Sequence, residues 1–288
     1  MPLSLEGAAS FLPVAGPVSK VLRAPVHVNG QSTIVEISQS SKSPFLIHAS
    51  SRPAFDRSRL RKIVNWLILS DLDLRPFYAL AAPHPVMGPV VAALTGLKPL
   101  RPATLFEMAI IAITEQQLSL AAAFHIRMRI VRRFGTPVDG LWVFPSPEIL
   151  AAAPLGDLGA CGLSHRKAEY ARDLARSVVD GTLDLDALIG QSDFQIRESL
   201  LRNRGFGEWS VQYILTRGFG RPDCLPAGDV GLRRVVGAYL TGGRRLTAAQ
   251  LERALSPFSP FRSLAAFYLA VHWRLRRQKA NGLHGSAI

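Results

Sequence analysis

The sequence predicts a mainly helical α+β protein in which a small antiparallel sheet precedes a helical domain. Three observations lead to this prediction. Alternating and β-branched runs fill residues 25–50, helical apolar periodicity takes over from about Leu72, and 48% of the 288 residues are apolar, which is enough for a sizeable core. We therefore place a sheet domain with one covering helix at residues 1–75 and a helical domain at residues 76–288.

The N-terminal segment has the composition of paired strands followed by a helix. Strand-like runs flank Asn29-Gly30, a dipeptide typical of tight hairpin turns, and the polar residues 38–43 mark a second turn. Asp56 is a candidate N-cap, and apolar residues then recur on one helical face up to Ser70. The simplest arrangement is an antiparallel sheet with a helix across it.

Capping residues, glycines and prolines divide the rest of the chain into helices. Thr104 and Glu107 have capping-box spacing and predict one continuous helix to Phe134. Another helix begins directly after Asp229. No strand is expected after about Leu72, so the second domain is predicted to be all helical. Further helices are expected at residues 165–179, 193–203, 208–217, 251–255 and 261–277.

The cysteine and histidine content argues against metal and disulfide chemistry. Only Cys161 and Cys224 are present, too few for the four thiolates of an iron–sulfur cluster and too far apart for a disulfide framework. His125, His165 and His272 lack metal-ligand spacing. We therefore expect no metal site, no iron–sulfur cluster and no required cofactor.

Charge and hydropathy indicate a cytoplasmic protein that binds polyanions. The net charge is +13 and the sequence pI about 10.6, which favours nucleic acid as a partner, although GC-rich coding also enriches arginine. No apolar run is long enough to span a membrane, and the first residues lack the basic region of a signal peptide.

The most specific local signal is the turn in LLRNRGFGEWSVQYIL, where Gly205 and Gly207 flank one apolar residue between two helices, at about residues 193–218. Glycine permits positive φ and removes side chains, so the amides that start the second helix can bind an anion such as a DNA phosphate. Exposed carbonyls of the turn could hold a monovalent cation that bridges to this phosphate. The alternative is an ordinary helix–turn–helix connection.

Asp229 ends the segment LPAGD and stands directly before an amphipathic helix. A structural helix cap is the ordinary role of an aspartate in this position. Asp223, earlier in the same loop, is better explained as a solvated turn residue. A chemical role for Asp229 therefore depends on what surrounds it.

The turn GFGEWS and the segment LPAGDVGLRR, whose Asp229 lies 22 residues after Gly207, resemble the helix-hairpin-helix DNA glycosylase superfamily. Residues 106–126, 162–175 and 262–269 resemble its 3-methyladenine DNA glycosylase II (AlkA-like) branch. The match runs in order over residues 77–273. This resemblance implies a protein that flips a damaged base out of duplex DNA and hydrolyses its glycosidic bond.

The resemblance also implies the residues of the reaction. Asp229 would be the catalytic carboxylate, which activates water or stabilises the oxocarbenium-like state. Trp209 and Tyr213, four residues apart on one helical face, would line the base pocket and attract cationic alkylated bases, with core packing as the alternative for Tyr213. Phe77 and Tyr78 could close the pocket, although either also suits a hydrophobic position at a domain junction.

Two positions differ from relatives in ways that affect the reaction. Relatives that also cleave DNA through a Schiff base carry a lysine where Trp209 stands here, so hydrolysis by water is expected. Ala270 stands where relatives often keep a tryptophan, which leaves the shape of the pocket open.

DNA contacts are implied at two places in the chain. The implied contacts are Gly205, Phe206, Gly207, Glu208 and Trp209 at the hairpin, together with Gln116 and Gln117, one of which fills the gap left by the flipped nucleotide.

The expected function is a monofunctional glycosylase that removes alkylated bases, of the 3-methyladenine type, from double-stranded DNA. A nucleoid-associated monomer is the default expectation, since a search for damage needs only one pocket. The alternative is a non-catalytic helix-hairpin-helix protein that only binds DNA, because the charge and the glycine turn would serve binding equally well.

Overall fold

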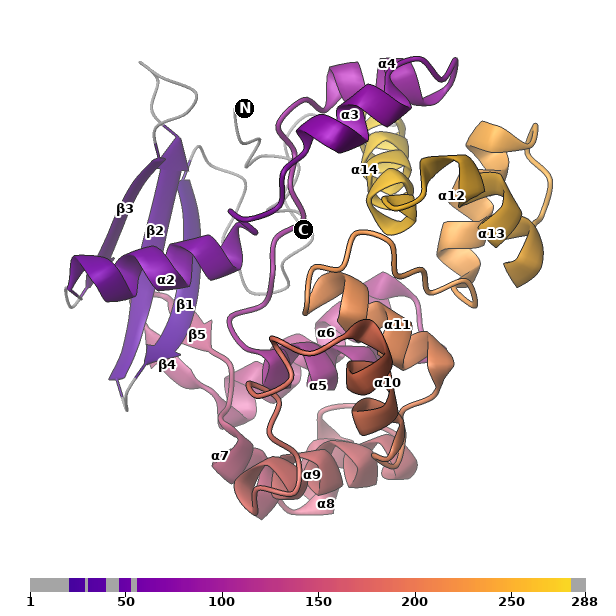
Figure 1. The fold of residues 1–288 in the computed structure, drawn as a ribbon. Helices are drawn as coiled ribbons and strands as arrows, with labels where there is room; N and C mark the ends of the chain where they lie inside the picture. Colours follow the sequence, from indigo (N-terminus) through magenta and orange to yellow (C-terminus); the bar gives the residue numbers. More distant parts are fainter. Residues whose placement is uncertain (1–20, 29–30, 40–46, 53–55, 281–288) are drawn as a thin grey trace.

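The N-terminal part of the molecule is a three-stranded antiparallel sheet with one helix across it (Figure 1). The computed structural model describes residues 21–28, 31–39, 47–52 and 56–280. Val28 pairs with Gln31, which confirms the hairpin predicted around residues 29–30, although that turn and the predicted second turn beyond Gln39 lie outside the described residues. The elements are β1 (Val21–Val28), β2 (Gln31–Gln39), β3 (Ile47–Arg52) and α2 (Arg57–Leu67).

The predicted cap of α2 is confirmed, because the carboxylate of Asp56 accepts a hydrogen bond from the backbone amide of Arg59 at 2.9 Å. The apolar face of α2 buries Val64 and Leu67 in the same core as Val35 and Ile37 of the sheet. The amphipathic helix thus removes one face of the sheet from water.

A second, two-stranded ribbon corrects the prediction of an all-helical second domain. It consists of β4 (Thr136–Val138) and β5 (Leu141–Val143), joined by Asp139 and Gly140, which both have positive φ, as tight hairpin turns require. Strands of three residues are too short to show an alternating pattern, so no sequence pattern indicates this ribbon. The ribbon lies against the N-terminal sheet, where Arg23 of β1 forms an ion pair with Asp139.

The remaining chain is helical, and most predicted helix starts are confirmed. Ser164 caps α9, and Thr247 and Gln250 form the predicted capping box of α13. No helix of the described residues is both long and apolar enough to cross a membrane. The helices are α3 (Arg75–Ala81), α4 (Met87–Ala93), α5 (Leu105–Glu115), α6 (Leu120–Phe134), α7 (Pro147–Ala152), α8 (Leu155–Ala160), α9 (His165–Val179), α10 (Asp193–Leu201), α11 (Glu208–Arg217), α12 (Val230–Leu240), α13 (Ala248–Leu255), the 3-10 turn η1 (Ser256–Phe258) and α14 (Arg262–Ala280).

The continuous helix predicted from Thr104 to Phe134 is wrong, because it breaks into α5 and α6. Gln117 adopts a left-handed φ of 56°, and the side chain of Ser119 accepts a hydrogen bond from the amide of Ala122 and starts α6. Apolar residues continue through the break, so periodicity alone hides it.

Two hydrophobic cores organise the molecule. The first joins the sheet, α2, α3 and α4 to α12, α13 and α14, whereas the second is built by α5 to α11 from residues 105–219. The chain therefore leaves the first core, builds the second, and returns through the loop between α11 and α12, which Figure 1 shows running from one helical group to the other. That loop ends at Asp229.

Candidate functional site

The turn between α10 and α11 is built around two glycines with different roles. Gly205 has φ +97°, and a Cβ added there would lie 2.4 Å from the ring of Tyr170, so both its conformation and its packing require glycine. Gly207 has an extended backbone and open space around it. Phe206, between them, is buried in the second core. Phe206 thus anchors the turn while Gly207 faces outward at the start of α11.

Glu208, the first residue of α11, places a negative side chain near the backbone amides that begin this helix. Glu208 is exposed, and its carboxylate forms an ion pair with Arg197 of α10 at 2.9 Å and accepts a hydrogen bond from Gln212. The bond from Arg197 lowers the pKa of Glu208, so the carboxylate is charged. Arg197 and Gln212 therefore engage the carboxylate of Glu208, and the expected anion-binding groups of the turn are the backbone amides that begin α11.

Gln116 and Gln117 have opposite orientations at the break between α5 and α6. The amide nitrogen of Gln116 donates to the carbonyl of Gly205 at 2.7 Å and to the hydroxyl of Ser210 at 3.0 Å. Gln117 is exposed. Gln116 therefore ties this break to the glycine turn, and Gln117 is the one of the pair that projects from the surface.

Lys167 of α9 completes this connection, and no sequence pattern indicated it. Its ammonium group donates to the carbonyl of Thr114 at 3.1 Å and to that of Gln116, which satisfies the open end of α5. Burial lowers the pKa of Lys167. The two surface segments predicted to contact DNA are thus joined through Gln116 and supported by α9.

Asp229 has two different partners. One carboxylate oxygen accepts a hydrogen bond from the amide of Leu232 at 2.7 Å and caps α12. The other accepts a hydrogen bond from the indole nitrogen of Trp209 at 3.3 Å. Asp229 is half-buried. The carboxylate is therefore a helix cap that also reaches the helix after the glycine turn.

Trp209 and Tyr213 form a stack beside this carboxylate. Their rings are nearly parallel, with an interplanar angle of 15° and centroids 5.1 Å apart. Both side chains are half-buried, and a Cβ added at Gly228 would lie 3.7 Å from the Trp209 ring. The structure thus brings together three of the predicted site residues, Asp229, Trp209 and Tyr213.

Phe77 and Tyr78 occupy a different environment. Phe77 is fully buried in the first core, where its ring contacts those of Tyr268 and Phe261. The hydroxyl of Tyr78 accepts a hydrogen bond from the amide of Gly96 and shares another with the hydroxyl of Tyr268. The described contacts of both rings are those of core residues, which favours the domain-junction alternative over an open pocket.

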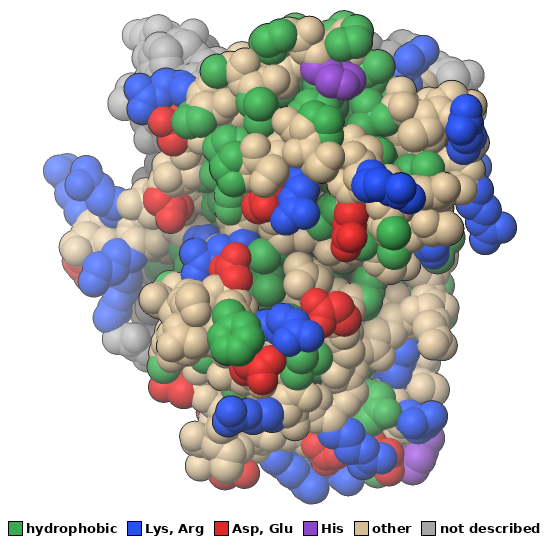
Figure 2. Space-filling model, turned by 45° about the vertical axis from the view of Figure 1, so that its right-hand side comes forward, with side chains coloured by type: hydrophobic (Ala, Val, Ile, Leu, Met, Phe, Trp, Pro, Cys, Tyr) green, Lys and Arg blue, Asp and Glu red, His purple; other side chains and the backbone are tan. Residues whose placement is uncertain are grey.

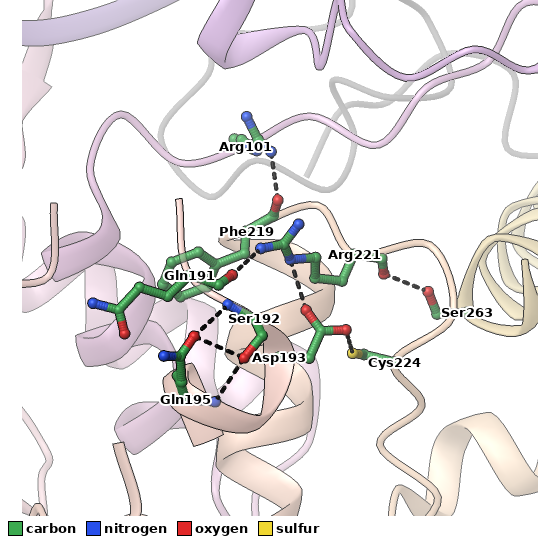
Figure 3. Close-up of polar contacts among 9 residues, drawn as sticks. All are labelled: Arg101, Gln191, Ser192, Asp193, Gln195, Phe219, Arg221, Cys224 and Ser263. Atoms are coloured by element: carbon green, nitrogen blue, oxygen red, sulfur yellow. Dashed lines mark hydrogen bonds and ion pairs between the residues drawn. The ribbon is translucent and has the colours of Figure 1, made fainter. Parts of the chain in front are cut away.

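Polar contacts fix the loop that leads to Asp229 (Figure 3). Arg221 forms an ion pair with Asp193, at the start of α10, at 2.8 Å and donates to the carbonyl of Gln191, while its own carbonyl accepts a hydrogen bond from Ser263 of α14. The thiol of Cys224 donates to the other oxygen of Asp193 at 3.3 Å. Burial raises the pKa of that thiol to about 12, so it remains protonated at neutral pH.

Asp223 is not the solvated turn residue that the sequence suggested. Its carboxylate binds the guanidinium of Arg262 through two hydrogen bonds of 2.9 and 2.7 Å and also accepts the backbone amide of Arg262. Burial would raise the pKa of Asp223, but the bonds from Arg262 outweigh that effect and lower it. The loop is thus anchored to α10 on one side and to α14 on the other.

A small cavity lies where the two cores meet. Its volume is about 30 Å³, enough for one or two water molecules but not for a nucleobase. Thr216 and Arg217 of α11, Leu264 and Phe267 of α14, and Leu69 are among the residues that line it. Because this lining does not include Trp209, Tyr213 or Asp229, the cavity is separate from the aromatic stack.

The positive charge of the protein is dispersed on the face in Figure 2. Lys and Arg side chains are spread widely there and alternate with Asp and Glu, so the net charge of +13 does not form one patch on this face.

Metal-ligand residues do not cluster in the part of the chain that the structure describes. Among the described residues, no group of three or more His, Cys, Asp or Glu side chains could hold a metal ion. Cys161 and Cys224 are free.

The helical fold and the glycine turn leading to Asp229 are those of the helix-hairpin-helix glycosylases, and comparison with known families agrees. The chain belongs to the HhH-GPD superfamily of base excision DNA repair proteins, whose family model matches residues 110–260. This confirms the resemblance drawn from the sequence motifs.

Individual relatives carry more specific names than the family does. The chain is 27% identical over 251 residues to a DNA-3-methyladenine glycosylase of Bacillus subtilis, covering 84% of this chain and 82% of the relative. It is 35% identical over 162 residues to a putative DNA-3-methyladenine glycosylase of the same organism, but this match spans only 55% of the relative and 56% of the chain. A 3-methyladenine DNA glycosylase from Archaeoglobus fulgidus has a similar structure, with a TM-score of 0.84, 24% identity, and 95% of this chain and 96% of that chain covered, which shows the shared fold.

Proposed function

We propose that this protein is a monofunctional DNA glycosylase that flips alkylated bases, of the 3-methyladenine type, out of double-stranded DNA and hydrolyses their glycosidic bonds. The observation that carries the proposal is the contact of the Asp229 carboxylate with Trp209, whose ring stacks on Tyr213. A carboxylate beside stacked, electron-rich rings suits both the binding of a cationic base and the stabilisation of positive charge on the sugar.

The chemistry assigned to Asp229 follows from its two oxygens. The amide of Leu232 fixes one oxygen, so the carboxylate has a defined orientation. The other oxygen, which meets the Trp209 indole at 3.3 Å, keeps a free lone pair that can accept a proton from an attacking water. An alkylated purine is already cationic and leaves readily, so the reaction needs no strong general acid, metal or cofactor.

Binding to DNA is assigned to the two joined surface segments. The outward amides after Gly207 would hold a backbone phosphate, in a contact that does not depend on base sequence. Gln117, exposed in its left-handed turn, would enter the gap left by the flipped nucleotide. Gln116 would keep the distance between these two contacts constant.

The absence of lyase activity is proposed from the residue at position 209. A Schiff base needs an amine next to the sugar, and the side chain that contacts Asp229 is an indole. Lys167, which lies next to the same turn region, already donates to two backbone carbonyls. Hydrolysis by water is therefore the reaction that these residues support.

Replacement of Asp229 by asparagine tests the proposal. Asn also caps helices, so Asp229→Asn should fold and bind DNA as the wild type does, whereas excision of methylated purines should fall by about 100-fold or more. The measurement is strand cleavage of methylated duplex DNA after treatment with alkali, together with fluorescence anisotropy for binding. Wild-type rates in this variant would remove the mechanism, and a borohydride-trapped adduct of the wild type with abasic DNA would show lyase chemistry.

A non-catalytic DNA-binding protein is the second candidate, because the glycine turn would serve it as well. Binding alone gives no reason for the Asp229 carboxylate to contact the aromatic stack. If the wild type binds methylated duplex DNA and leaves its bases in place under single-turnover conditions, this second function replaces the first.

A further inference from the structure

Arg233 of α12 is a half-buried cation that lies one helical turn after Asp229. Its backbone amide donates to the carbonyl of Asp229 at 3.0 Å, which fixes this spacing. Its Nε is buried without a hydrogen bond, and no group in the described part of the chain pairs with its guanidinium. Arginine keeps its charge in proteins, so the side chain lacks the partner that burial of a charge ordinarily requires.

The stability of α12 alone gives no reason for an arginine at this position. The backbone amides at the N-terminus of a helix carry partial positive charge, which favours anions and disfavours cations nearby. The first turn of α12 contains no acidic residue, and Arg234 directly follows Arg233. Two positive side chains thus lie beside the positive end of the helix, and a bound anion would stabilise this arrangement.

Asp229 is the expected partner of Arg233, because side chains four residues apart lie on the same face of a helix. The structure shows a different pairing. The two carboxylate oxygens of Asp229 accept hydrogen bonds from the amide of Leu232 and from the indole of Trp209. One face of α12 therefore carries two separate charges of opposite sign, and the positive one is left for a group outside the described chain.

We infer that the guanidinium of Arg233 binds a backbone phosphate of the nucleotide whose base is excised. The inference rests on the function proposed above and deepens it, because it adds a phosphate site on α12 to the one at the glycine turn. A flipped nucleotide brings its phosphates close to the carboxylate that acts on its sugar, and these negative charges repel each other. Arginine binds phosphate through two parallel hydrogen bonds, and its charge offsets that repulsion.

The test measures DNA affinity as a function of salt. Fluorescence anisotropy gives the Kd for a duplex with a tetrahydrofuran abasic-site analogue, from about 50 to about 200 mM salt. Arg233→Gln, which removes the charge, should weaken binding by about three- to tenfold at the lowest salt. The slope of log Kd against log salt should decrease by about one, because one counterion fewer is released. Arg233→Lys, which keeps the charge, should retain the wild-type slope.

Arg172→Gln is the matched control. Arg172 of α9 is also half-buried, with a buried Nε that makes no hydrogen bond, but its helix packs against α7 and α8 in the second core. This variant should leave both the affinity and the slope unchanged. A wild-type slope in Arg233→Gln would overturn the inference even if excision falls, because the guanidinium would then act on Asp229 and not on a phosphate.

A second measurement needs only the wild-type protein, so it decides the question even if Arg233→Gln does not fold. The phosphate on the 5′ or the 3′ side of the abasic analogue is replaced by an uncharged methylphosphonate. One of these two duplexes should bind the wild type about three- to tenfold more weakly, with little further loss in Arg233→Gln. Equal affinity of the wild type for both modified duplexes and the unmodified one would overturn the inference. Absence of excision by a wild type that still shows this phosphate dependence would overturn the proposed reaction alone.

Discussion

At the scale of single residues, the two glycines of the turn make different demands on the sequence. Gly205→Ala puts a Cβ at φ +97° against the Tyr170 ring and should destabilise the fold by about 2 kcal/mol or more. Gly207→Ala meets nothing within 4 Å and should change stability by less than about 0.5 kcal/mol. Its added methyl group should weaken DNA binding, because it would crowd the phosphate proposed to bind there. Thermal unfolding measures the stability of the two variants, and anisotropy titrations measure their affinity for DNA. Equal melting temperatures of Gly205→Ala and Gly207→Ala would contradict the different roles assigned to the two glycines.

Short patterns in the sequence identify Gly205 and Gly207 as turn residues and Asp229 as a helix cap. The site roles of Asp229, Trp209 and Tyr213 are predicted only from the resemblance to the glycosylase family. The contact between Asp229 and Trp209 is confirmed only by the structure, because it depends on how the returning loop is placed. Contacts made across the fold leave no local pattern, and the sequence did not indicate Lys167 for that reason.

At the scale of elements, α5 shows both the strength and the limit of sequence patterns. Thr104 caps it as predicted, with its side chain accepting the amide of Glu107. The sequence pattern does not indicate where α5 ends, because the end depends on the left-handed conformation of Gln117 and on hydrogen bonds that Lys167 and Gln116 make with other parts of the fold. Every residue of α5 is buried, so no polar face marks its limits.

The buried start of α5 predicts a pH dependence of stability. Burial raises the pKa of Glu107 to about 7, against the opposing effects of the Ala103 amide and Arg127. The folded state then binds the proton more tightly than the unfolded state, so this contribution to stability is present below about pH 4.5 and is lost as the pH rises towards 7. Glu107→Gln should become more stable relative to the wild type between pH 5 and 8, by at most about 3 kcal/mol. A stability difference that does not change with pH, in denaturant titrations, would refute this.

At the scale of the whole molecule, the two cores are joined by chain crossings that contact each other. Arg101, just before α5, donates to the carbonyl of Phe219, just after α11 (Figure 3). The guanidinium of Arg101 also lies 4.4 Å from the centre of the Trp66 ring. The helical content and the sheet were predictable from periodicity. The return of the chain to its first core was not, because the apolar residues of α12 and α14 do not specify which core they enter.

The return loop is therefore the part of the whole architecture on which the site depends, and its anchors should affect catalysis without affecting binding. Asp223→Asn keeps an acceptor for the Arg262 amide but loses the charge that holds the guanidinium. The loop that carries Asp229 should then be less well positioned, and single-turnover excision should fall by about tenfold with DNA affinity unchanged, since the glycine turn lies on other elements. Asp157→Asn, which breaks the exposed ion pair with Arg133, is the control and should leave both unchanged. Because the folded-state pKa of Asp223 is lowered, its stabilising effect is complete above the ordinary carboxyl range and is lost as the pH falls through that lowered value. Equal excision rates in Asp223→Asn and Asp157→Asn would show that the loop holds Asp229 in place without this anchor.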